Sequence, residues 1–456
     1  MTLYKGRIDP GRNELMDALN RSLPVDIRFF PHDVKTNRIW ADELTRIGVF
    51  TPAEHQAIDD ALNRISARWA AGEFDTIPDD EDIHTLTERL LTELLGDTGA
   101  RIHTGRSRND QVACDLLLYL KDALAELKSH TIALILTIAD IAERHAETLV
   151  AGMTHVQPAQ PITLGHFLMS LCSALLRDVS RMDDTRNRMD RCPLGAGAIA
   201  GCGFPVDRER IARELGFREP ADNSIDATSD RDAAQESAFV CAALLTHLSR
   251  YAEQFVLWSN PAFGYVKWAD TWSTGSSMMP QKRNPDAMEL VRAKAARVIG
   301  DTTALLAVTK GVPLAYAKDL QEDKEAVFDA LDTALVAVRV FNEALKTACF
   351  LPDRMLAGLT SDMLATDLAD ALVTTGVPFR KAHERTARFL NSLEVTGRDL
   401  LAATPAELQN AFPEFDTPPR LGYRESLDRR QVVGGTAPAS VRRQIEAVKK
   451  QLGTLK

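Results

Sequence analysis

Several signatures of cofactor binding are missing from this sequence. Its 456 residues contain no G-x-x-x-x-G-K-[ST] phosphate loop and no G-x-G-x-x-G dinucleotide motif. The six cysteines form no C-x-x-C pair and show no spacing to histidine that is typical of zinc sites. We therefore expect no metal, nucleotide or flavin. Most cysteines lie in apolar stretches, where buried, reduced thiols are expected.

Long hydrophobic runs and an excess of positive charge are missing too. The most apolar segment, residues 131–142, is too short for a bilayer, which needs about 20 apolar residues. Residues 1–9 contain no apolar signal core. The formal net charge is −10, which is unfavourable for binding nucleic acid or an anionic membrane. We expect a cytoplasmic protein with neither a nucleic-acid nor a membrane partner.

Apolar residues recur with helical spacing along most of the chain. Between residues 111 and 145 they repeat at three- and four-residue steps, the period of one face of an α-helix. Charged residues interrupt these stretches, and apolar residues occur on both faces, which indicates a bundle that buries surface against other subunits. Convincing strands are scarce, so the predicted fold class is all-α. Four further long helices are expected over residues 163–189, 233–258, 285–310 and 323–349.

Shorter helical pieces flank the long helices. Prolines and glycines break the pattern before residue 105, and short helices with loops return after about residue 350. This change predicts an N-terminal helical domain over residues 1–105, a central long-helix bundle over 106–350 and a C-terminal helical domain over 351–456.

The first of four polar segments is H-T-G-R-S-R-N-D, residues 103–110, which directly precedes a long helix. Arg106 and Arg108 offer bidentate recognition of a carboxylate, and Asn109 supplies a neutral donor and acceptor. The alternative is a solvated loop in which Asp110 caps the helix.

The second polar segment is T-H-V-Q-P-A-Q-P, residues 154–161, and it also opens a predicted helix. His155 is the natural general acid or base because the ordinary pKa of histidine lies near neutrality. Thr154 and two glutamines beside it favour a functional role, although a lone histidine is often structural.

The third polar segment is G-S-S-M-M-P-Q-K-R-N-P-D, residues 275–286. Pro285 suits the first helical position and Asn284 the cap before it. Amide groups, a helix N-terminus and Lys282 then converge on one volume, where they favour a carboxylate of growing charge. Ser276 lacks the G-x-S-x-G elbow of hydrolases, but it could act as a base if loop amides stabilised its alkoxide. The alternative is a solvated turn.

The fourth polar segment is Y-A-K-D-L-Q-E-D-K, residues 316–324. Tyr316, Gln321 and Lys324 provide mixed donors that suit a ligand with both charged and amide-like groups. Taken alone, the segment is also compatible with an ordinary charged helix start.

Together these segments resemble the argininosuccinate lyase family of the fumarase/aspartase superfamily. The third matches the superfamily signature G-S-S-x-M-P-x-K-x-N-P. The runs H-T-G-R-S-R-N-D-Q-V, T-H-x-Q-x-A-Q-P and L-Q-E-D-K-E match the pattern of the argininosuccinate lyases. Further matches, E-D-I-H at residues 81–84 and G-G-T-A at residues 434–437, extend the likeness over nearly the whole chain.

The resemblance implies reversible cleavage of argininosuccinate into arginine and fumarate by β-elimination, the last step of arginine synthesis. By family likeness Ser276 takes the proton, and His155 or its hydrogen-bonded network protonates the departing guanidino nitrogen. No cofactor is implied. The superfamily builds each active site from three subunits of a homotetramer. Residues at positions suited to bind the substrate or its developing charge are Ser22, Asn109, Thr154, Lys282, Asn284, Tyr316, Gln321 and Lys324.

Three departures from the family pattern concern the amine part of the substrate. The opening W-G-G-R-F is Y-K-G-R-I at residues 4–8, and Ala317 replaces an asparagine. The segment T-N replaces a Gly-Ser pair, with Lys35 and Arg38 on either side. These departures keep open a lyase of the same fold for another N-substituted aspartate. A catalytically silent, crystallin-like structural protein is a further alternative.

Overall fold

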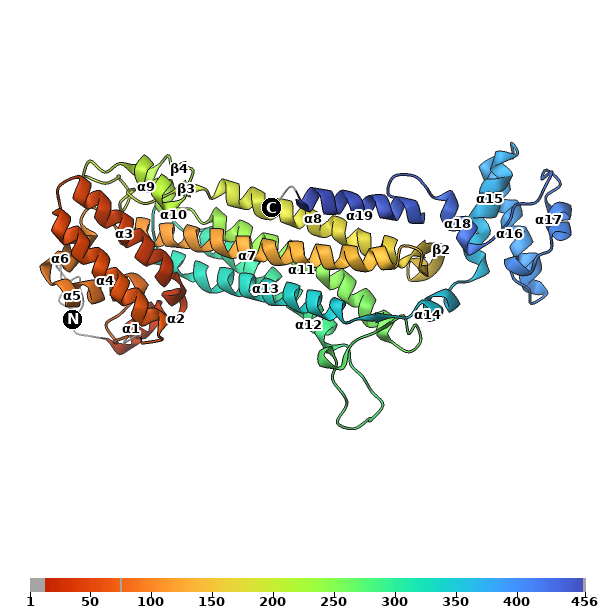
Figure 1. Cartoon of the computed structure of the whole chain (residues 1–456), viewed down its shortest axis with the longest axis horizontal. Coiled ribbons are helices and arrows are strands. Elements are labelled where there is room, and N and C mark those ends of the chain that lie inside the picture. The colour runs from red at the N-terminus through yellow and green to blue at the C-terminus, as the bar shows by residue number, and fades with distance from the viewer. Residues whose placement is uncertain (1–12, 74–75, 454–456) are drawn as a thin grey trace. The chain divides into compact units, whose positions relative to one another are not determined.

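The structure, a computed structural model, describes residues 13–73 and 76–453, so the departure at residues 4–8 lies outside it. Helices dominate the described chain (Figure 1), which confirms the predicted α-helical fold class. The described strands form three small two-stranded sheets, with orders β1-β2, β3-β4 and β5-β6. Within the described residues, no helix is both long enough and apolar enough to cross a membrane.

Five long helices form where the apolar periodicity predicts them. On α7 the buried leucines Leu116, Leu120, Leu124 and Leu127 repeat at three- and four-residue steps, so they occupy one face. The long helices are α7 (Arg108–Arg144), α8 (Leu164–Arg188), α11 (Asp232–Ser259), α12 (Asp286–Thr309) and α13 (Asp323–Lys346).

The chain divides into two compact units, and each long helix contributes a part to both. The first unit takes in residues up to 129, 180–243 and 296–335. Besides its parts of the long helices, it contains α1 (Glu14–Asn20), α2 (Leu23–Asp26), α3 (Phe30–Arg46), α4 (Pro52–Ala70), α5 (Ile83–Leu95), α6 (Asp97–Ala100), α9 (Arg208–Leu215), α10 (Ser224–Ser229) and the parallel pair β3 (Arg191–Cys192) and β4 (Glu219–Pro220). Short 3-10 turns η1 (Ile27–Phe29), η2 (Arg101–His103) and η4 (Lys318–Glu322) join some of these helices.

Aromatic side chains join the N-terminal helices of this unit to its long helices. The rings of Phe29, Tyr119 on α7 and Phe328 on α13 meet edge to face, with centroids 4.8–5.6 Å apart. Such contacts add to the stabilisation from buried apolar area. Helices α3 and α4 lie side by side (Figure 1), and Pro52 begins α4 after a capping box formed by Thr51 and Glu54.

The second unit takes in residues 130–179, 244–295 and 336–456. It contains the antiparallel pairs β1 (Leu149–Thr154) with β2 (Gln157–Thr163), and β5 (Val266–Lys267) with β6 (Cys349–Phe350). Its shorter helices are α14 (Pro352–Ala357), α15 (Ala365–Thr374), α16 (Phe379–Val395), α17 (Pro405–Ala411), α18 (Tyr423–Arg429) and α19 (Pro438–Gly453), with 3-10 turns η3 (Asp270–Trp272), η5 (Ser361–Leu364) and η6 (Leu400–Ala402).

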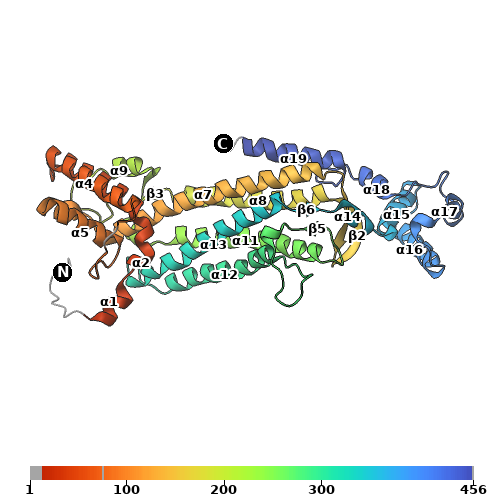
Figure 2. The same cartoon turned by 60° about the horizontal axis from the view of Figure 1, so that its bottom comes forward.

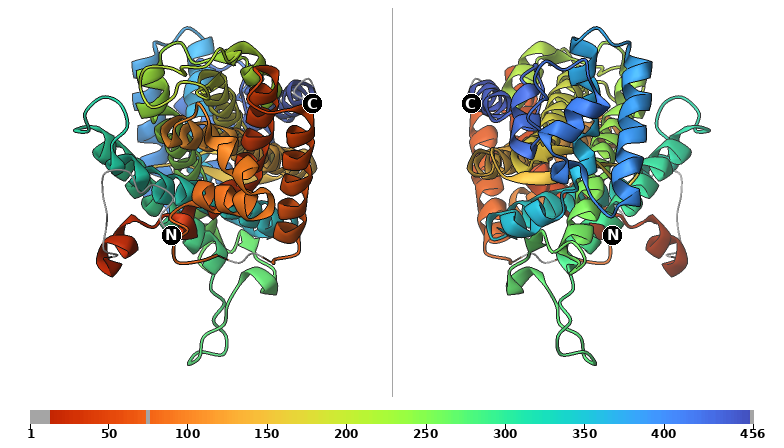
Figure 3. Two further views of the ribbon diagram at one scale, coloured as in Figure 1. Left: turned by 90° about the vertical axis from the view of Figure 1, so that its left-hand side faces the viewer. Right: turned by 90° about the vertical axis from the view of Figure 1, so that its right-hand side faces the viewer.

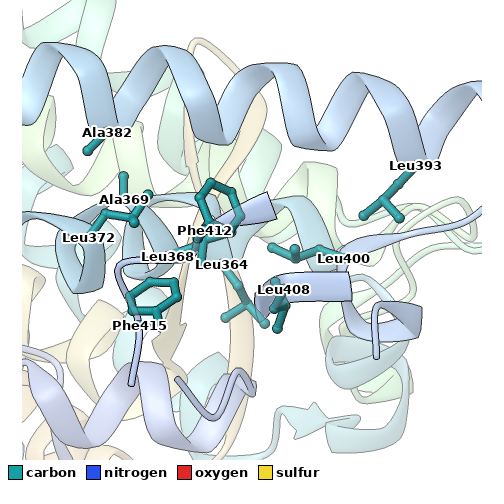
Figure 4. Close-up of a cluster of buried hydrophobic side chains, with 10 residues drawn as sticks. All are labelled: Leu364, Leu368, Ala369, Leu372, Ala382, Leu393, Leu400, Leu408, Phe412 and Phe415. Atoms are coloured by element: carbon teal, nitrogen blue, oxygen red, sulfur yellow. The ribbon is translucent and has the colours of Figure 1, made fainter. Parts of the chain in front are cut away.

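Two apolar clusters organise the second unit. Phe255 on α11 contacts Phe167 on α8 and Phe341 on α13, which holds three long helices together. A separate cluster around Leu368 and Phe412 packs α15, α16 and α17 against one another (Figures 2 and 4). The predicted three-domain division, with boundaries at residues 105 and 350, stays a prediction.

Candidate active site

The ends of the serine loop, residues 275–283, are clamped beside the start of α12. Thr274 and Asn284 pair as an isolated antiparallel bridge, with amide-to-carbonyl distances of 3.3 and 2.8 Å. The Asp286 carboxylate accepts from the Thr274 amide at 3.0 Å and from its hydroxyl at 2.7 Å. The residues Thr274, Asn284 and Asp286 therefore hold the two ends of the loop together and form its neck. From this neck the serine loop extends as a long, narrow loop before α12 (Figure 3).

Ser276 lies in a small cradle of main-chain amides. Its Oγ accepts hydrogen bonds from the amide of Met278 at 3.2 Å and from that of Met279 at 3.0 Å. Donors aimed at one oxygen favour negative charge on it. Amide donors of this kind are what a serine needs if its alkoxide is to act as a base. The Ser276 side chain remains partly accessible, and the neighbouring Met278 is 86% exposed.

Lys282 and Asn284 have different surroundings. Lys282 is exposed, and its ammonium has no hydrogen bond or ion pair with any residue that the structure describes. The Asn284 side-chain amide donates to the Thr274 hydroxyl at 3.3 Å and to the Gly275 carbonyl at 3.4 Å. Asn284 therefore closes the loop and does not cap the helix. The predicted cap was wrong: α12 begins at Asp286, one residue later than expected.

Thr154 and His155 lie on a β-hairpin. Strands β1 and β2 are joined by His155 and Val156, whose φ angles are 55° and 61°. Two central residues with positive φ define a type I′ turn, which matches the twist of a hairpin. The prediction that this segment opens a helix was wrong, because β2 intervenes and α8 begins only at Leu164. The turn presents the His155 side chain to solvent.

A cavity of about 280 Å³ lies beside this hairpin. Thr154, Gln160, His166, Gln254 and Trp258 contribute to its lining. Burial lowers the pKa of His166, and its Nδ1 is buried with no hydrogen-bond partner among the described residues. His166 and Gln254 were missed in the sequence because they lie inside apolar helical stretches, where single polar residues carry no pattern.

The remaining predicted residues belong to the first unit, where Ser22 is held from two sides. Its hydroxyl donates to the Asp26 carboxylate at 2.6 Å, and its amide donates to the Glu81 carbonyl at 2.9 Å. Asp26 is itself buried and accepts from the Ile83 amide at 3.0 Å. Burial and then the charge of Asp82 raise the pKa of Asp26. Ser22 is thus placed rigidly, with its oxygen lone pairs still able to accept.

The segment around η4 brings three more predicted residues into this unit. The Gln321 side-chain amide donates to the carbonyl of Asn20 at 3.1 Å, and Asn20 lies two residues before Ser22 in the sequence. Lys324 is buried, and its Nζ lies 2.7 Å from the carboxylate of the adjacent Asp323. Tyr316 is partly buried, and burial raises its pKa.

The guanidinium groups of the two arginines in the first polar segment are paired to different extents. Arg106 is buried, stacks at 5.8 Å over the Trp40 ring and donates to the Asn37 side chain at 2.7 Å. Arg108 lies 3.3 Å from the Glu88 carboxylate. Arg106 Nε and Nη1 are buried with no hydrogen-bond partner among the described residues, and the expectation that both arginines recognise a substrate carboxylate stays a prediction. Basic residues in a polar sequence run give no indication of which will be buried.

The cap of α7, which this segment precedes, is not the expected residue Asp110. Helix α7 begins at Arg108, so the cap position falls on Ser107 and not on Asp110. The Asp110 carboxylate accepts from the amides of Ser107 at 3.0 Å, Gly195 at 3.0 Å and Gly197 at 2.8 Å. Asp110 thereby connects the loop of residues 193–198, P-L-G-A-G-A, to the start of the helix. Asn109 follows on the helix and is partly exposed.

The two extra positive charges in α3 point to other helices of their own unit. Lys35 donates to the Leu215 carbonyl at 2.8 Å, at the end of α9. Arg38 pairs with Asp59 and donates to the Asn63 side chain at 2.9 Å, both on α4. These contacts favour a structural role of both residues over a role in selecting the amine.

Asp33, His84 and Asp115 form a fully buried cluster whose potential metal-ligand atoms lie within 4.8 Å of one another. His84 Nδ1 is 2.9 Å from Asp33 and 3.4 Å from Asp115. Burial opposes charge on the imidazole, but Asp33, Asp82 and Asp115 outweigh it and raise the pKa of His84. Gln111 and Thr36 also donate to the two carboxylates. Hydrogen bonds from His84, Gln111 and Thr36 therefore link the cluster, while Asp115 Oδ2 is buried with no hydrogen-bond partner among the described residues.

Profiles of known families match two parts of the chain. A family described as lyase matches residues 6–300, and a family described as argininosuccinate lyase C-terminal matches residues 362–428. Together they include every predicted site residue except Tyr316, Gln321 and Lys324.

Whole-length relatives and solved structures extend this likeness. The chain is 43% identical to argininosuccinate lyase of Pelotomaculum thermopropionicum, over 98% of this chain and 97% of that protein. It is 44% identical to argininosuccinate lyase of Desulforudis audaxviator, over 99% of both. Among solved structures, EDDS lyase in complex with formate is similar with a TM-score of 0.82 and 27% identity, over 94% of this chain and 87% of that one.

Proposed function

The chain belongs to the argininosuccinate lyase family of the fumarase/aspartase superfamily, and on that premise we propose that it cleaves argininosuccinate reversibly to arginine and fumarate. The reaction is a β-elimination by a carbon–nitrogen lyase. In the cell it would form the last step of arginine synthesis, in the cytoplasm and without a metal or organic cofactor.

The amide cradle of Ser276 is the observation that carries the mechanism. In the forward direction a base removes a proton from the carbon next to a carboxylate, and a doubly charged aci-carboxylate results. A serine hydroxyl is a weak base, so its alkoxide must be stabilised before it can take this proton. The amides of Met278 and Met279 supply that stabilisation at 3.2 and 3.0 Å.

Stabilising the aci-carboxylate lowers most of the remaining barrier. Lys282 carries a charge that no described residue neutralises, and it lies in the same loop as Ser276. The N-terminus of α12 directs the positive end of its dipole toward the same neck. In this proposal Lys282 and Asn284 bind the carboxylate as its second charge develops.

Breaking the C–N bond requires a proton for the departing guanidino nitrogen. His155 supplies it, directly or through its hydrogen-bonded network, because its imidazole is exposed on a fixed hairpin turn. Thr154 on the same turn binds substrate. Further substrate contacts come from Ser22, Asn109, Tyr316, Gln321 and Lys324 of the first unit.

Self-association as a homotetramer with shared active sites completes the proposal. Large apolar side chains are exposed on three long helices: Phe239 on α11 (55%), Leu290 (58%), Ile299 (49%) and Leu306 (53%) on α12, and Val336 on α13 (49%). Exposed apolar surface of this kind is typical of protein–protein contact. Covering it with equivalent helices of other subunits would form the shared bundle.

Ala317 keeps a second candidate open, a lyase that releases fumarate from another N-substituted aspartate. It directly precedes η4, where the family pattern has an asparagine, so one side-chain amide is missing beside Tyr316 and Gln321. The similar EDDS lyase structure belongs to the same fold. The contacts of Lys35 with α9 and of Arg38 with Asp59 on α4 favour argininosuccinate, because they hold both side chains against helices of their own unit.

Fumarate absorbance tests the proposal directly. Purified protein should release fumarate from argininosuccinate and, in reverse, consume fumarate with arginine. Diamines and carboxylated amino acids, offered separately with fumarate, form the comparison. If fumarate adds to a carboxylated amine but not to arginine, the second candidate function replaces the first. If fumarate reacts with none of the amines, a catalytically silent structural protein is favoured.

A further inference from the structure

Arg231, Asp323 and Lys324 form a buried ionic triad in the first unit. Each residue is at most 3% exposed. The Asp323 carboxylate pairs with Arg231 Nε through one oxygen and with Lys324 Nζ, 2.7 Å away, through the other. Asp323 is the first residue of α13, and Arg231 directly precedes α11. The triad therefore joins the starts of two long helices.

The charges of the triad do not cancel. Burial opposes ionisation of Asp323, but Lys324 and then Arg231 outweigh it, so the pKa of that carboxyl lies below its usual value. One ionised carboxylate then faces two cations, which leaves a net charge of +1. Lys324 and Asp323 alone would be a neutral pair and would attract an anion only weakly.

Arg231 is held in place but is not saturated. Its Nη1 donates to the Asp230 carbonyl at 2.6 Å, and its Nε pairs with Asp323. Its Nη2 is buried and has no hydrogen-bond partner among the described residues. The guanidinium also acts electrostatically on Tyr316, where it opposes the effect of burial. Tyr316, a second residue that is proposed to bind the substrate, is thus influenced by the charge of Arg231.

We propose that Arg231 is a positioning residue for substrate binding: by sharing Asp323 it leaves the ammonium of Lys324 with surplus positive charge for a substrate carboxylate. This inference rests on the proposed function of Lys324, and it adds a residue that contacts no substrate. The role of Arg231 is inferred from the structure alone. Nothing in its sequence neighbourhood, T-S-D-R-D, indicates an ionic partner 92 residues away.

Arg231→Gln removes the charge and keeps most of the side-chain length. We expect it to weaken binding of succinate and fumarate, measured by calorimetry on the intact protein, by at least about tenfold. In the lyase assay the KM for argininosuccinate should rise more than kcat falls, because the lost interaction is made to the bound ground state as well. Arg231→Lys should restore affinity to within about threefold.

Arg188→Gln is the matched control, because Arg188 pairs with Glu236 in the same unit but its side chain is 60% exposed. It should leave dicarboxylate affinity unchanged. If Arg231→Gln does not fold, Arg231→His replaces it, and its affinity should fall between about pH 6 and pH 8 as the imidazole loses its charge, more than that of the parent protein.

The outcomes separate this inference from the proposed function. Equal affinity of the parent protein and Arg231→Gln, equal losses in Arg231→Gln and Arg231→Lys, or no dicarboxylate binding by the parent protein would overturn it. If dicarboxylate binding depends on the charge at position 231 but argininosuccinate releases no fumarate, the inference is supported. The same result counts against argininosuccinate as the substrate.

Discussion

At the scale of single residues, function depends on charges that the protein holds out of water or leaves unpaired. Ser276 receives two amide donors, whereas Lys282 receives no partner from the described chain. Those opposite treatments suit opposite tasks. In the proposed mechanism the serine oxygen becomes negative before it takes the proton, and the ammonium stays free to bind the charge that the substrate develops.

Replacing Ser276 by alanine should lower the rate of fumarate release at least ~1,000-fold, roughly 4 kcal/mol of barrier, because the base is lost. The fold should survive, since one hydroxyl in an exposed loop contributes little packing. Ser277→Ala is the control, because that neighbouring side chain is exposed and makes no hydrogen bond within the described structure. A Ser276→Ala rate above one tenth of the parent rate would remove Ser276 from the base role.

The buried His84 cluster predicts how stability depends on pH. Asp33, Asp82 and Asp115 raise the pKa of His84 against the effect of burial, and burial with Asp33 raises the pKa of Asp115. Groups with raised pKa bind protons more tightly when folded, so their contribution is full below the unfolded-state values and is lost as pH rises through the folded ones. For His84 that loss begins above about pH 6.5.

Denaturant unfolding across a pH series checks this prediction against a His84→Gln variant. The parent protein should lose unfolding free energy from about pH 6.5 upward, and the variant should lose less. The difference between the two should therefore shrink as pH rises. A difference that grows with pH would show that His84 is neutral in the folded protein.

At the scale of elements, the hairpin that carries Thr154 and His155 is strained. Val156 is branched at Cβ and adopts φ of 61°, a region that such residues rarely enter. Strained backbone tends to persist at functional sites, where the surrounding structure enforces it. Here the turn geometry fixes the direction of His155 more firmly than a flexible loop would.

Val156→Gly should relieve this strain and raise the unfolding free energy by about 0.5–1 kcal/mol, because glycine enters the left-handed region without a steric penalty. The side chain is 68% exposed, so little packing is lost. Val156→Ala is the matched control, since it keeps the unfavourable φ for a residue with Cβ. Chemical denaturation of the three proteins measures the effect, and a glycine variant less stable than the alanine variant would contradict it.

Elements with a sustained apolar period were predictable from the sequence, and those set by local geometry were not. Helix α7 was predicted because its leucines repeat over many turns and must share one face. The hairpin was missed because Q-P-A-Q-P-I-T contains two prolines and no alternating pattern, so only its turn angles reveal it. Candidate residues were found through spacing and likeness. The burial of Arg106 and the Arg231–Asp323 pair depend on tertiary packing that no local pattern records.

At the scale of the whole molecule, exposed apolar residues on the long helices support the proposed association with other subunits. Leu306→Glu on α12 should dissociate the assembly, because a charge would have to be buried in the proposed subunit contact. Fumarate release should fall together with molecular mass, since each site is proposed to need several subunits. Light scattering and activity at the same concentration measure both.

Val433→Glu is the control for this prediction, because Val433 is fully exposed and lies outside the long helices. It should change neither mass nor rate. A Leu306→Glu monomer with full activity would refute the shared-site proposal, whereas an inactive tetramer would place the effect of the substitution within one subunit.

The neck of the serine loop has a consequence for proteolysis. Lys282 and Arg283 follow one another on exposed chain, and a protease that cleaves after basic residues needs such an extended, accessible segment. One cut there leaves Ser276 with its amide donors on one fragment and Asn284 on the other. Hydrogen bonds between Thr274, Asn284 and Asp286 would still join the fragments. A nicked molecule would therefore keep its helices and its mass under native conditions while its catalytic loop had come apart.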